Sequence, residues 1–121
     1  MSARYITTDR EGNVFVSNNW LNFVEVYDLS GHFVFKFGGS GSAEGRMQAP
    51  QGICIDSSGS VFVANKQNDR VDMFTRLGKF VRTVINVTKP VALAIGPSGD
   101  LIVTTVTLQM VSIFPHRMVW P

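Results

Sequence analysis

The sequence contains little of what catalytic, metal-binding and secreted proteins commonly require. Its one cysteine, Cys54, excludes an internal disulfide framework and any zinc site built from several cysteines. Its two histidines, His32 and His116, lack the spacing of a metal-binding pair. It also has no run of apolar residues long enough to span a bilayer and no signal-peptide pattern. We therefore predict no metal, no cofactor, no membrane contact and a cytoplasmic location.

Charged residues are also scarce, at 17% of the chain with a net charge of +2. This charge alone argues for neither nucleic acid nor membrane as a partner. No pair of carboxylates and no nucleophile with an adjacent base stands out, so we predict that the chain is not an enzyme on its own. In contrast, 45% hydrophobic residues with nine Phe can build a core, and 11 Gly with 5 Pro suit a turn-rich β protein.

The segment from Pro50 to Val84 predicts four short strands. Apolar runs at 52–55, 61–64, 71–74 and 80–84 are rich in β-branched and aromatic residues. Turn residues separate them, including Gly59, which can adopt a positive φ angle, and the pair Leu77-Gly78. Four strands at this spacing predict one antiparallel meander.

The same pattern occurs before and after this segment. Gly12, Asn18 and Phe33 lie 47 positions ahead of Gly59, Asn65 and Phe80, and the apolar run 101–103 lies 40 positions after 61–63. Repeats of 40 to 50 residues with four strands each indicate the blades of a β-propeller. The predicted fold is all-β, a partial β-propeller of nearly three four-stranded antiparallel blades.

The middle copy reads Pro-x-Gly-Ile-x-Ile-Asp-x-x-Gly-x-Val-x-Val-Ala from Pro50, continuing to Asn68, Arg70-Val71, Phe74, Gly78 and Phe80. This pattern resembles an NHL repeat. NHL repeats form β-propeller domains, such as the C-terminal domain of tripartite-motif (TRIM) ubiquitin ligases. The resemblance covers nearly the whole chain.

We expect blade one at about 4–38, blade two at about 50–85 and blade three at about 90–121, with the last strand truncated near Trp120. The Gly-rich stretch from Gly38 to Arg46 could be a flexible linker or a phosphate loop, but no Lys-Ser or helix follows it, so we interpret it as a blade connection. Fewer than three full blades cannot close a ring, and the two end blades then expose apolar flanks. Either the chain is a fragment, which we favour, or copies associate to complete the propeller.

Alternate connections of a meander emerge on opposite faces of the propeller. One face collects the tight turns, with Asp9, Asp28 and Asp56 among its five acids and three bases. The other collects the blade connections and the second-to-third strand loops, where bases, amides and an aromatic suit phosphate contact and base stacking. This second face is the predicted binding site, with the residues Asn18, Asn19, Trp20, Asn22, Arg46, Lys66, Gln67, Asn68, Arg70 and Lys89.

Three residues of the chain have competing interpretations. The resemblance implies that Arg70 pairs with backbone or with the acid at Asp56 rather than with a ligand. Trp20 either contacts a partner or packs on a neighbouring blade, and both interpretations stay open. Cys54 alternates with Ile53 and Ile55 in a predicted inner strand, so we expect a buried and unreactive thiol.

The resemblance implies a non-catalytic interaction module that recruits a protein substrate or adaptor, as in a TRIM-type ubiquitin ligase. Ligase activity would need RING and B-box zinc modules, which this sequence does not contain. The alternative is binding of single-stranded RNA on the loop face, in post-transcriptional regulation. A lyase of the NHL type is a weaker alternative, because its histidine ligands and disulfides have no counterpart here.

Overall fold

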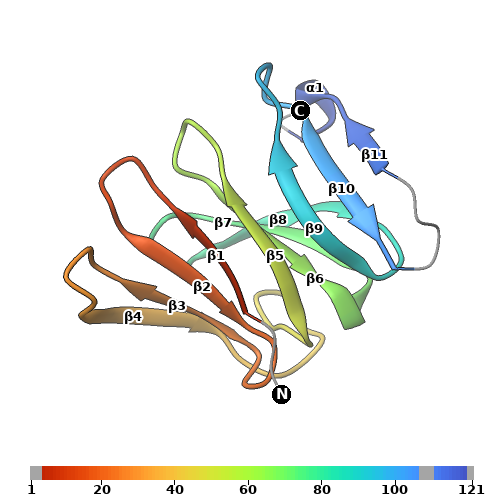
Figure 1. Ribbon diagram of the computed structural model, residues 1–121. Coiled ribbons are helices and arrows are strands. Elements are labelled where there is room, and N and C mark those ends of the chain that lie inside the picture. The colour runs from red at the N-terminus through yellow and green to blue at the C-terminus, as the bar shows by residue number, and fades with distance from the viewer. Residues whose placement is uncertain (1–3, 107–110, 120–121) are drawn as a thin grey trace.

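The computed structural model describes residues 4–106 and 111–119, which form three antiparallel sheets (Figure 1). The first sheet contains β1 (Arg4–Thr8), β2 (Val14–Asn18), β3 (Phe23–Tyr27) and β4 (Phe33–Gly38). The second contains β5 (Pro50–Ile55), β6 (Val61–Asn65), β7 (Arg70–Phe74) and β8 (Phe80–Asn86). The third contains β9 (Pro90–Ile95), β10 (Leu101–Thr105) and β11 (Val111–Phe114). The all-β propeller architecture predicted from the sequence is thus confirmed.

Two short helical segments were not expected. A 3₁₀-helix, η1 (Lys66–Asn68), lies between β6 and β7, and α1 (His116–Val119) follows β11 and contacts β8. Pro115 ends β11, as its missing N–H favours. Trp120, the residue expected to begin the last strand, lies outside the described residues. No described helix is long and apolar enough to cross a membrane.

The tight turns are stabilised by polar side chains that accept hydrogen bonds from their own backbone. Asp9 Oδ1 accepts the N–H groups of Glu11 and Asn13, and Asp56 Oδ1 accepts those of Ser58 and Ser60 at 2.9 Å. Asp28 accepts such bonds in the turn that follows β3, and Thr75 accepts them in the turn that follows β7. These bonds fix where each strand begins, so the acids predicted for turn positions serve the turns.

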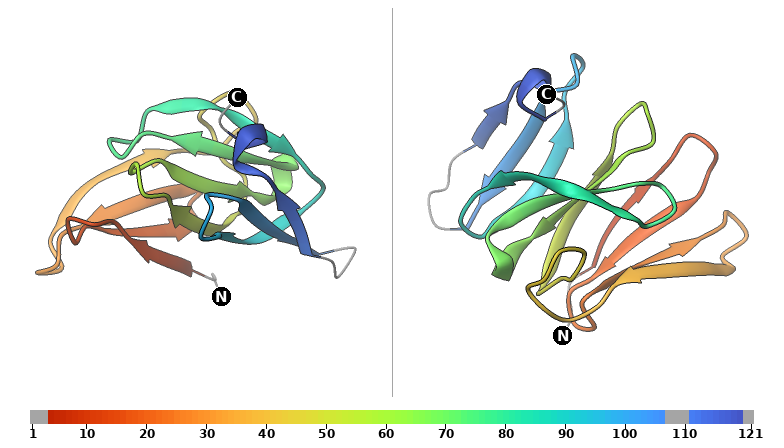
Figure 2. Two further views of the ribbon diagram at one scale, coloured as in Figure 1. Left: turned by 90° about the horizontal axis from the view of Figure 1, so that it is seen from above. Right: turned by 180° about the vertical axis from the view of Figure 1, so that it is seen from behind.

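The three sheets are arranged side by side, with their first strands closest together. The strand β5 lies between β1 and β9, as all views show (Figure 2). A Cβ atom added to Gly52 in β5 would lie 2.6 Å from the carbonyl oxygen of Val91 and 2.9 Å from the backbone nitrogen of Leu93. Glycine at this position therefore permits the close approach of β5 and β9.

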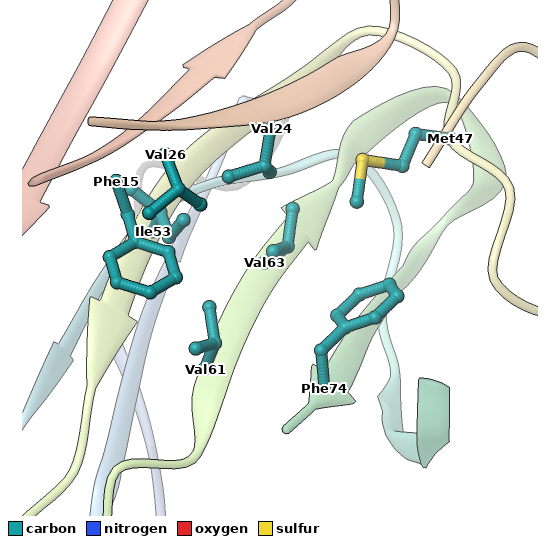
Figure 3. Close-up of a cluster of buried hydrophobic side chains, with 8 residues drawn as sticks. All are labelled: Phe15, Val24, Val26, Met47, Ile53, Val61, Val63 and Phe74. Atoms are coloured by element: carbon teal, nitrogen blue, oxygen red, sulfur yellow. The ribbon is translucent and has the colours of Figure 1, made fainter. Parts of the chain in front are cut away.

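Two apolar interfaces hold the sheets together. We call the face of each sheet that points to the next sheet its forward face, and the opposite face its rear face. Phe15, Val24 and Val26 on the forward face of the first sheet pack against Ile53, Val61, Val63 and Phe74 on the rear face of the second (Figure 3). Cys54, Phe62, Val71 and Met73 on the forward face of the second sheet pack against Leu101 and Val103 of the third.

Cys54 belongs to the second of these interfaces, and the residue is 8% exposed. Burial, with a smaller contribution from the charge of Asp56, raises the pKa of Cys54 to about 12. A thiol of this kind is a poor nucleophile at neutral pH. The expectation of a buried cysteine is confirmed, and its low reactivity stays a prediction.

Candidate interaction face

The predicted binding residues lie on, or directly beside, four neighbouring segments that we call the loop face. These are the β2–β3 turn, the Gly-rich connection 39–49, the η1 segment and the short connection 87–89. Hydrogen bonds join the segments, for example from Asn68 Nδ2 to Gly41 O at 2.9 Å and from Gln67 N to Gln48 O at 3.0 Å. The loops that the sequence assigned to one face are therefore contiguous.

The β2–β3 turn presents two apolar side chains to solvent. Trp20 is 70% exposed and Leu21 is 52% exposed. The backbone N–H groups of both residues donate to Oδ1 of Asn18, at 3.1 and 3.0 Å, and the side chain of Asn18 is buried. Asn22 has a backbone φ angle of 65°. Its side chain donates a hydrogen bond to Ser40 Oγ and accepts one from Ala49 N. Asn18 and Asn22 thus fix the backbone that displays Trp20 and Leu21, and Asn19 lies partly exposed beside them.

The Gly-rich connection is anchored by side chains of the second sheet. Arg70 donates from Nη1 to Ser42 O at 3.0 Å and from Nη2 to Ala43 O at 3.1 Å. Asn65 Nδ2 donates to Arg46 O at 2.8 Å, while Asn65 Oδ1 accepts from Gln48 N. These bonds satisfy backbone carbonyl groups that glycine-rich loops otherwise leave to water. The segment is a fixed blade connection rather than a free linker.

The same side chains bind a buried carboxylate. Asp72 is fully buried and accepts from Arg70 Nε at 2.9 Å, from Asn65 Nδ2 at 3.0 Å and from Thr83 Oγ1 at 2.7 Å. Arg70 and Asp72 are two residues apart in β7, so both side chains lie on one face of the strand. The expected backbone partners of Arg70 are confirmed. The expected acid partner, Asp56, is wrong, because Asp56 follows β5 at the end of the sheet opposite to Arg70.

Only part of the predicted positive charge remains available on the loop face. The guanidinium group of Arg70 is hydrogen-bonded to Asp72 and to the loop carbonyl groups. The Nζ atom of Lys89 lies 3.7 Å from Asp69 Oδ1 and donates to Gln67 Oε1 at 3.1 Å. Arg46 is exposed and donates to Gly38 O at 3.2 Å, and Lys66 has no side-chain partner among the described residues. Two of the four predicted bases, Arg46 and Lys66, therefore remain free to contact a ligand.

The sequence did not predict the central role of Asp72, Asn65 and Thr83, or the exposure of Leu21. The available signal was an acid, Asp72, in the middle of the otherwise apolar run 71–74 of β7. A charge at an inward-facing strand position requires a buried partner. Two positions earlier, Arg70 lies on the same face and supplies it.

A hollow lies on the opposite face, between the β1–β2 and β5–β6 turns. Its volume is about 390 Å³, and its lining residues include Asp9, Arg10, Glu11, Asp56 and Arg76. Arg76 bridges it by an exposed ion pair with Glu11 at 3.3 Å. The pKa of Asp9 here lies below its ordinary value: partial burial raises it, but hydrogen bonds from the Asn13 side chain and the turn's N–H groups outweigh that effect. The carboxylates of Asp9 and Asp56 accept bonds within their own turns, which gives them a structural role. Within the described residues, no three metal-ligating side chains come together.

Short segments of the chain are similar in sequence to known NHL proteins. A segment of 48 residues is 42% identical to Protein lin-41 of Caenorhabditis elegans and covers 40% of this chain and 4% of that protein. A segment of 44 residues is 41% identical to the E3 ubiquitin-protein ligase TRIM71 of Xenopus tropicalis, covering 36% of this chain and 5% of the ligase. NHL-repeat-containing protein 4 of Mus musculus is 34% identical over 55 residues, which are 45% of this chain and 40% of that protein. The matched segments span less than half the length of each relative. No family model matches the chain.

Solved structures share the fold over most of the chain. Hydrazine synthase of Kuenenia stuttgartiensis aligns with a TM-score of 0.77 at 16% identity, over 94% of this chain and 33% of that one. A virginiamycin B lyase of Staphylococcus aureus with quinupristin aligns with a TM-score of 0.66 at 16% identity, over 91% of this chain and 40% of that one. These likenesses show the fold alone. Together with the NHL relatives, they bear out the resemblance seen in the sequence: part of the chain is similar to NHL-repeat proteins, and its sheets align with β-propeller structures.

Proposed function

We propose that the chain is a non-catalytic interaction module that recruits a protein partner through the loop face. The observation that carries the proposal is the exposed pair Trp20 and Leu21 on a turn that Asn18 and Asn22 hold in one conformation. Tryptophan is among the residues that most often dominate protein–protein binding. A turn fixed before binding loses little conformational entropy when the partner arrives.

The relatives support a role of this kind in a ubiquitin ligase. TRIM71 is named an E3 ubiquitin-protein ligase, and this chain is similar to about 5% of its length. We propose that the chain supplies the recognition of a protein substrate or adaptor in such an assembly, while the transfer of ubiquitin would be the task of zinc modules that it does not contain. The proposed location is the cytoplasm.

The experiment compares three forms of the immobilised chain in quantitative capture from cytosol treated with ribonuclease. The forms are wild type, the double variant Trp20→Ala with Leu21→Ala, and the control Leu77→Ala. Leu77 is 66% exposed but lies on the β7–β8 turn, away from the loop face. We expect specific proteins to be retained by the wild type and the control and lost by the double variant. Equal capture by all three forms would overturn the proposal.

The alternative, single-stranded RNA, is favoured by the cations Arg46 and Lys66, which lie on the same loop face as Trp20, an exposed aromatic that could stack on a base. We place it second because Arg70 and Lys89 are engaged by Asp72, Asp69 and Gln67. Two phosphate contacts predict a slope of about −1.4 for the logarithm of RNA affinity against the logarithm of salt concentration. Binding of a random RNA pool with this slope, lost in Arg46→Ala with Lys66→Ala, would favour RNA over protein.

A further inference from the structure

Two hollows on the face opposite to the loop face are built from the same positions of the repeat. We call this face the turn face, because the tight turns lie on it. The first hollow, described above, lies between the first and second sheets, and a second one of about 150 Å³ lies between the β5–β6 and β9–β10 turns. Ser58 and His116 line the second hollow, 47 positions after Glu11 and 40 positions after Arg76, which line the first. The hollow is therefore a feature of the junction between sheets, and it recurs with different residues.

The two junctions differ in the charges that they hold at these equivalent positions. At the first junction, Glu11 of the β1–β2 turn pairs with Arg76 of the β7–β8 turn, with 3.3 Å between carboxylate oxygen and guanidinium nitrogen. This ion pair joins the first sheet to the second. At the second junction the acid is replaced by Ser58 and the base by His116. A phosphate on Ser58 would restore an acid there, because a phosphoserine carries a charge of about −1.5 to −2 at pH 7.

Ser58 is exposed at the tip of the β5–β6 turn, and arginines lie against both of its neighbours in the chain. On one side, Arg10 Nη1 donates to the carbonyl oxygen of Ser57 at 3.4 Å. On the other side, a Cβ atom added to Gly59 would lie 3.9 Å from Arg76 Cδ. Ser58 also borders both hollows, the first with Arg10 and Arg76 and the second with His116. Basic side chains from three separate segments therefore surround the position that a phosphate on Ser58 would occupy.

Both arginines are held loosely enough to bind a new anion. The bond from Arg10 to Ser57 is long, and the pair of Arg76 with Glu11 is exposed, so it contributes little to stability. A phosphate offers two oxygens at once to a guanidinium group and forms stronger bonds than an exposed carboxylate pair. The acid of the same turn, Asp56, opposes the phosphate. However, its Oδ1 atom accepts the N–H groups of Ser58 and Ser60 at 2.9 Å, and these dipoles offset part of its charge.

We propose that Ser58 is a phosphorylation site and that its phosphate strengthens the contacts between the sheets on the turn face. A protein kinase would transfer the γ-phosphoryl group of a nucleoside triphosphate to Ser58 Oγ. The new phosphorus–oxygen bond forms as the bond to the β-phosphate oxygen breaks, the nucleoside diphosphate leaves, and the hydroxyl proton passes to the general base of the kinase. The modification acts on the face opposite to the loop face, so the proposal does not depend on what the loop face binds.

The first experiment asks whether the modification occurs. The full chain is incubated with cytosolic extract and ATP, and mass spectrometry locates the phosphate. We expect phosphate on Ser58 in the wild type and in the matched control Ser57→Ala, which changes the neighbouring serine of the same turn. The variant Ser58→Ala should carry no phosphate on this turn. Absence of phosphate from Ser58, or its presence on Ser57 instead, would overturn the proposal.

The second experiment measures what the phosphate does. The full chain is produced with phosphoserine incorporated at position 58, and its melting temperature is compared with that of the unmodified chain. We expect a rise of at least about 3 °C, the shift that a charge-assisted hydrogen bond gives in a domain of this size. In the double variant Arg10→Ala with Arg76→Ala, the difference between the two forms should shrink to less than half. Each background is compared with its own unmodified form, so any change in basal stability cancels.

A phosphoserine at position 30 is the control for the charge alone. Ser30 is exposed on the β3–β4 turn and lines neither hollow. The modified control should melt within about 1 °C of the unmodified chain, since it gains no bond between sheets. An unchanged or lower melting temperature with phosphate on Ser58, a rise that persists without the two arginines, or an equal rise in the control would each contradict the proposed role.

Discussion

Arg70 donates from Nε to the buried carboxylate of Asp72 at 2.9 Å while its other two nitrogens donate to carbonyl groups of the Gly-rich connection. One side chain therefore neutralises a charge inside the second sheet and anchors the loop that leads into it. This relationship, not ligand binding, accounts for the arginine of the middle repeat. The loop face consequently has a rigid framework beneath a small set of exposed side chains.

Replacing Asp72 by alanine tests this framework. The change leaves Arg70 and Asn65 without their shared acceptor, and we expect the free energy of unfolding to fall by about 3 kcal/mol, the range for breaking a buried pair by removing one partner. Urea denaturation measures it. The control is Glu11→Ala, which removes an exposed ion pair with Arg76 and should change stability by less than about 1 kcal/mol. Equal effects of the two changes would contradict the framework role.

Replacing Gly52 by alanine tests the contact between the inner strands. The new methyl group would meet the backbone of Val91 and Leu93 at less than 3.0 Å, and backbone atoms cannot rotate away. We expect a loss of about 1 to 3 kcal/mol, the usual cost of overpacking. Gly96→Ala is the matched control, because its nearest new contact, to Ile102 Cδ1, is an ordinary 3.6 Å. A thermal melt in which both variants resemble the wild type would show that β5 and β9 are farther apart than described.

Cys54 should resist alkylation in the native protein. Its pKa of about 12 leaves almost no thiolate at pH 8, and the thiol is buried, whereas in urea the side chain should react at the rate of a free cysteine. Mass spectrometry after timed exposure to iodoacetamide measures both rates. Rapid native alkylation would contradict the burial.

The same pKa predicts how stability changes at high pH. Because the folded-state pKa of Cys54 is raised, the unfolded chain loses its thiol proton first, and stability falls as the pH rises from the ordinary thiol pKa towards 12. Other groups also titrate there, so the measured quantity is the difference between wild type and Cys54→Ala. The wild type should lose more stability than the variant across this window, and parallel curves would contradict the raised pKa.

Asp9 predicts the opposite behaviour in acid. Its folded-state pKa is lowered, so its contribution to stability is present above the unfolded pKa and is lost as the pH falls through the folded value. Asp9→Ala should lower stability by about 1 kcal/mol at pH 7, the usual contribution of such hydrogen bonds, and by progressively less at lower pH. Denaturation at several pH values checks the convergence. The control is Ser30→Ala, because Ser30 is exposed and only its backbone N–H donates to Asp28. The stability of this variant should match that of the wild type at every pH.

Much of the fold was predictable because alternation and turn chemistry act locally. Gly12, Gly59 and Gly99 mark the same turn in each repeat with φ angles of 87°, 86° and 82°, and the apolar runs between such turns became strands. The contiguity of the loop face followed from meander geometry alone. What the sequence did not predict depends on contacts between distant segments. The acid partner of Arg70 was predicted wrongly. The resemblance pointed to Asp56, but Asp56 lies at the opposite end of the sheet, and the carboxylate within reach of Arg70 is that of Asp72. The cavity beside Asp9 arises from the relative position of two sheets, and no local pattern encodes that.

The anchoring of the Gly-rich connection by Asn65, Asn68 and Arg70 has a consequence for recombination. All three donors belong to the second sheet or to its η1 segment, yet their acceptors precede that sheet in the chain. A transplant that moved residues 50–86 alone would separate these donors from their acceptors and leave Arg70 with Asp72 but without the carbonyl groups of the connection. A transplant of residues 39–86 would carry the donors and acceptors together. The unit that can be transferred with its hydrogen bonds intact is therefore a sheet together with the loop that precedes it.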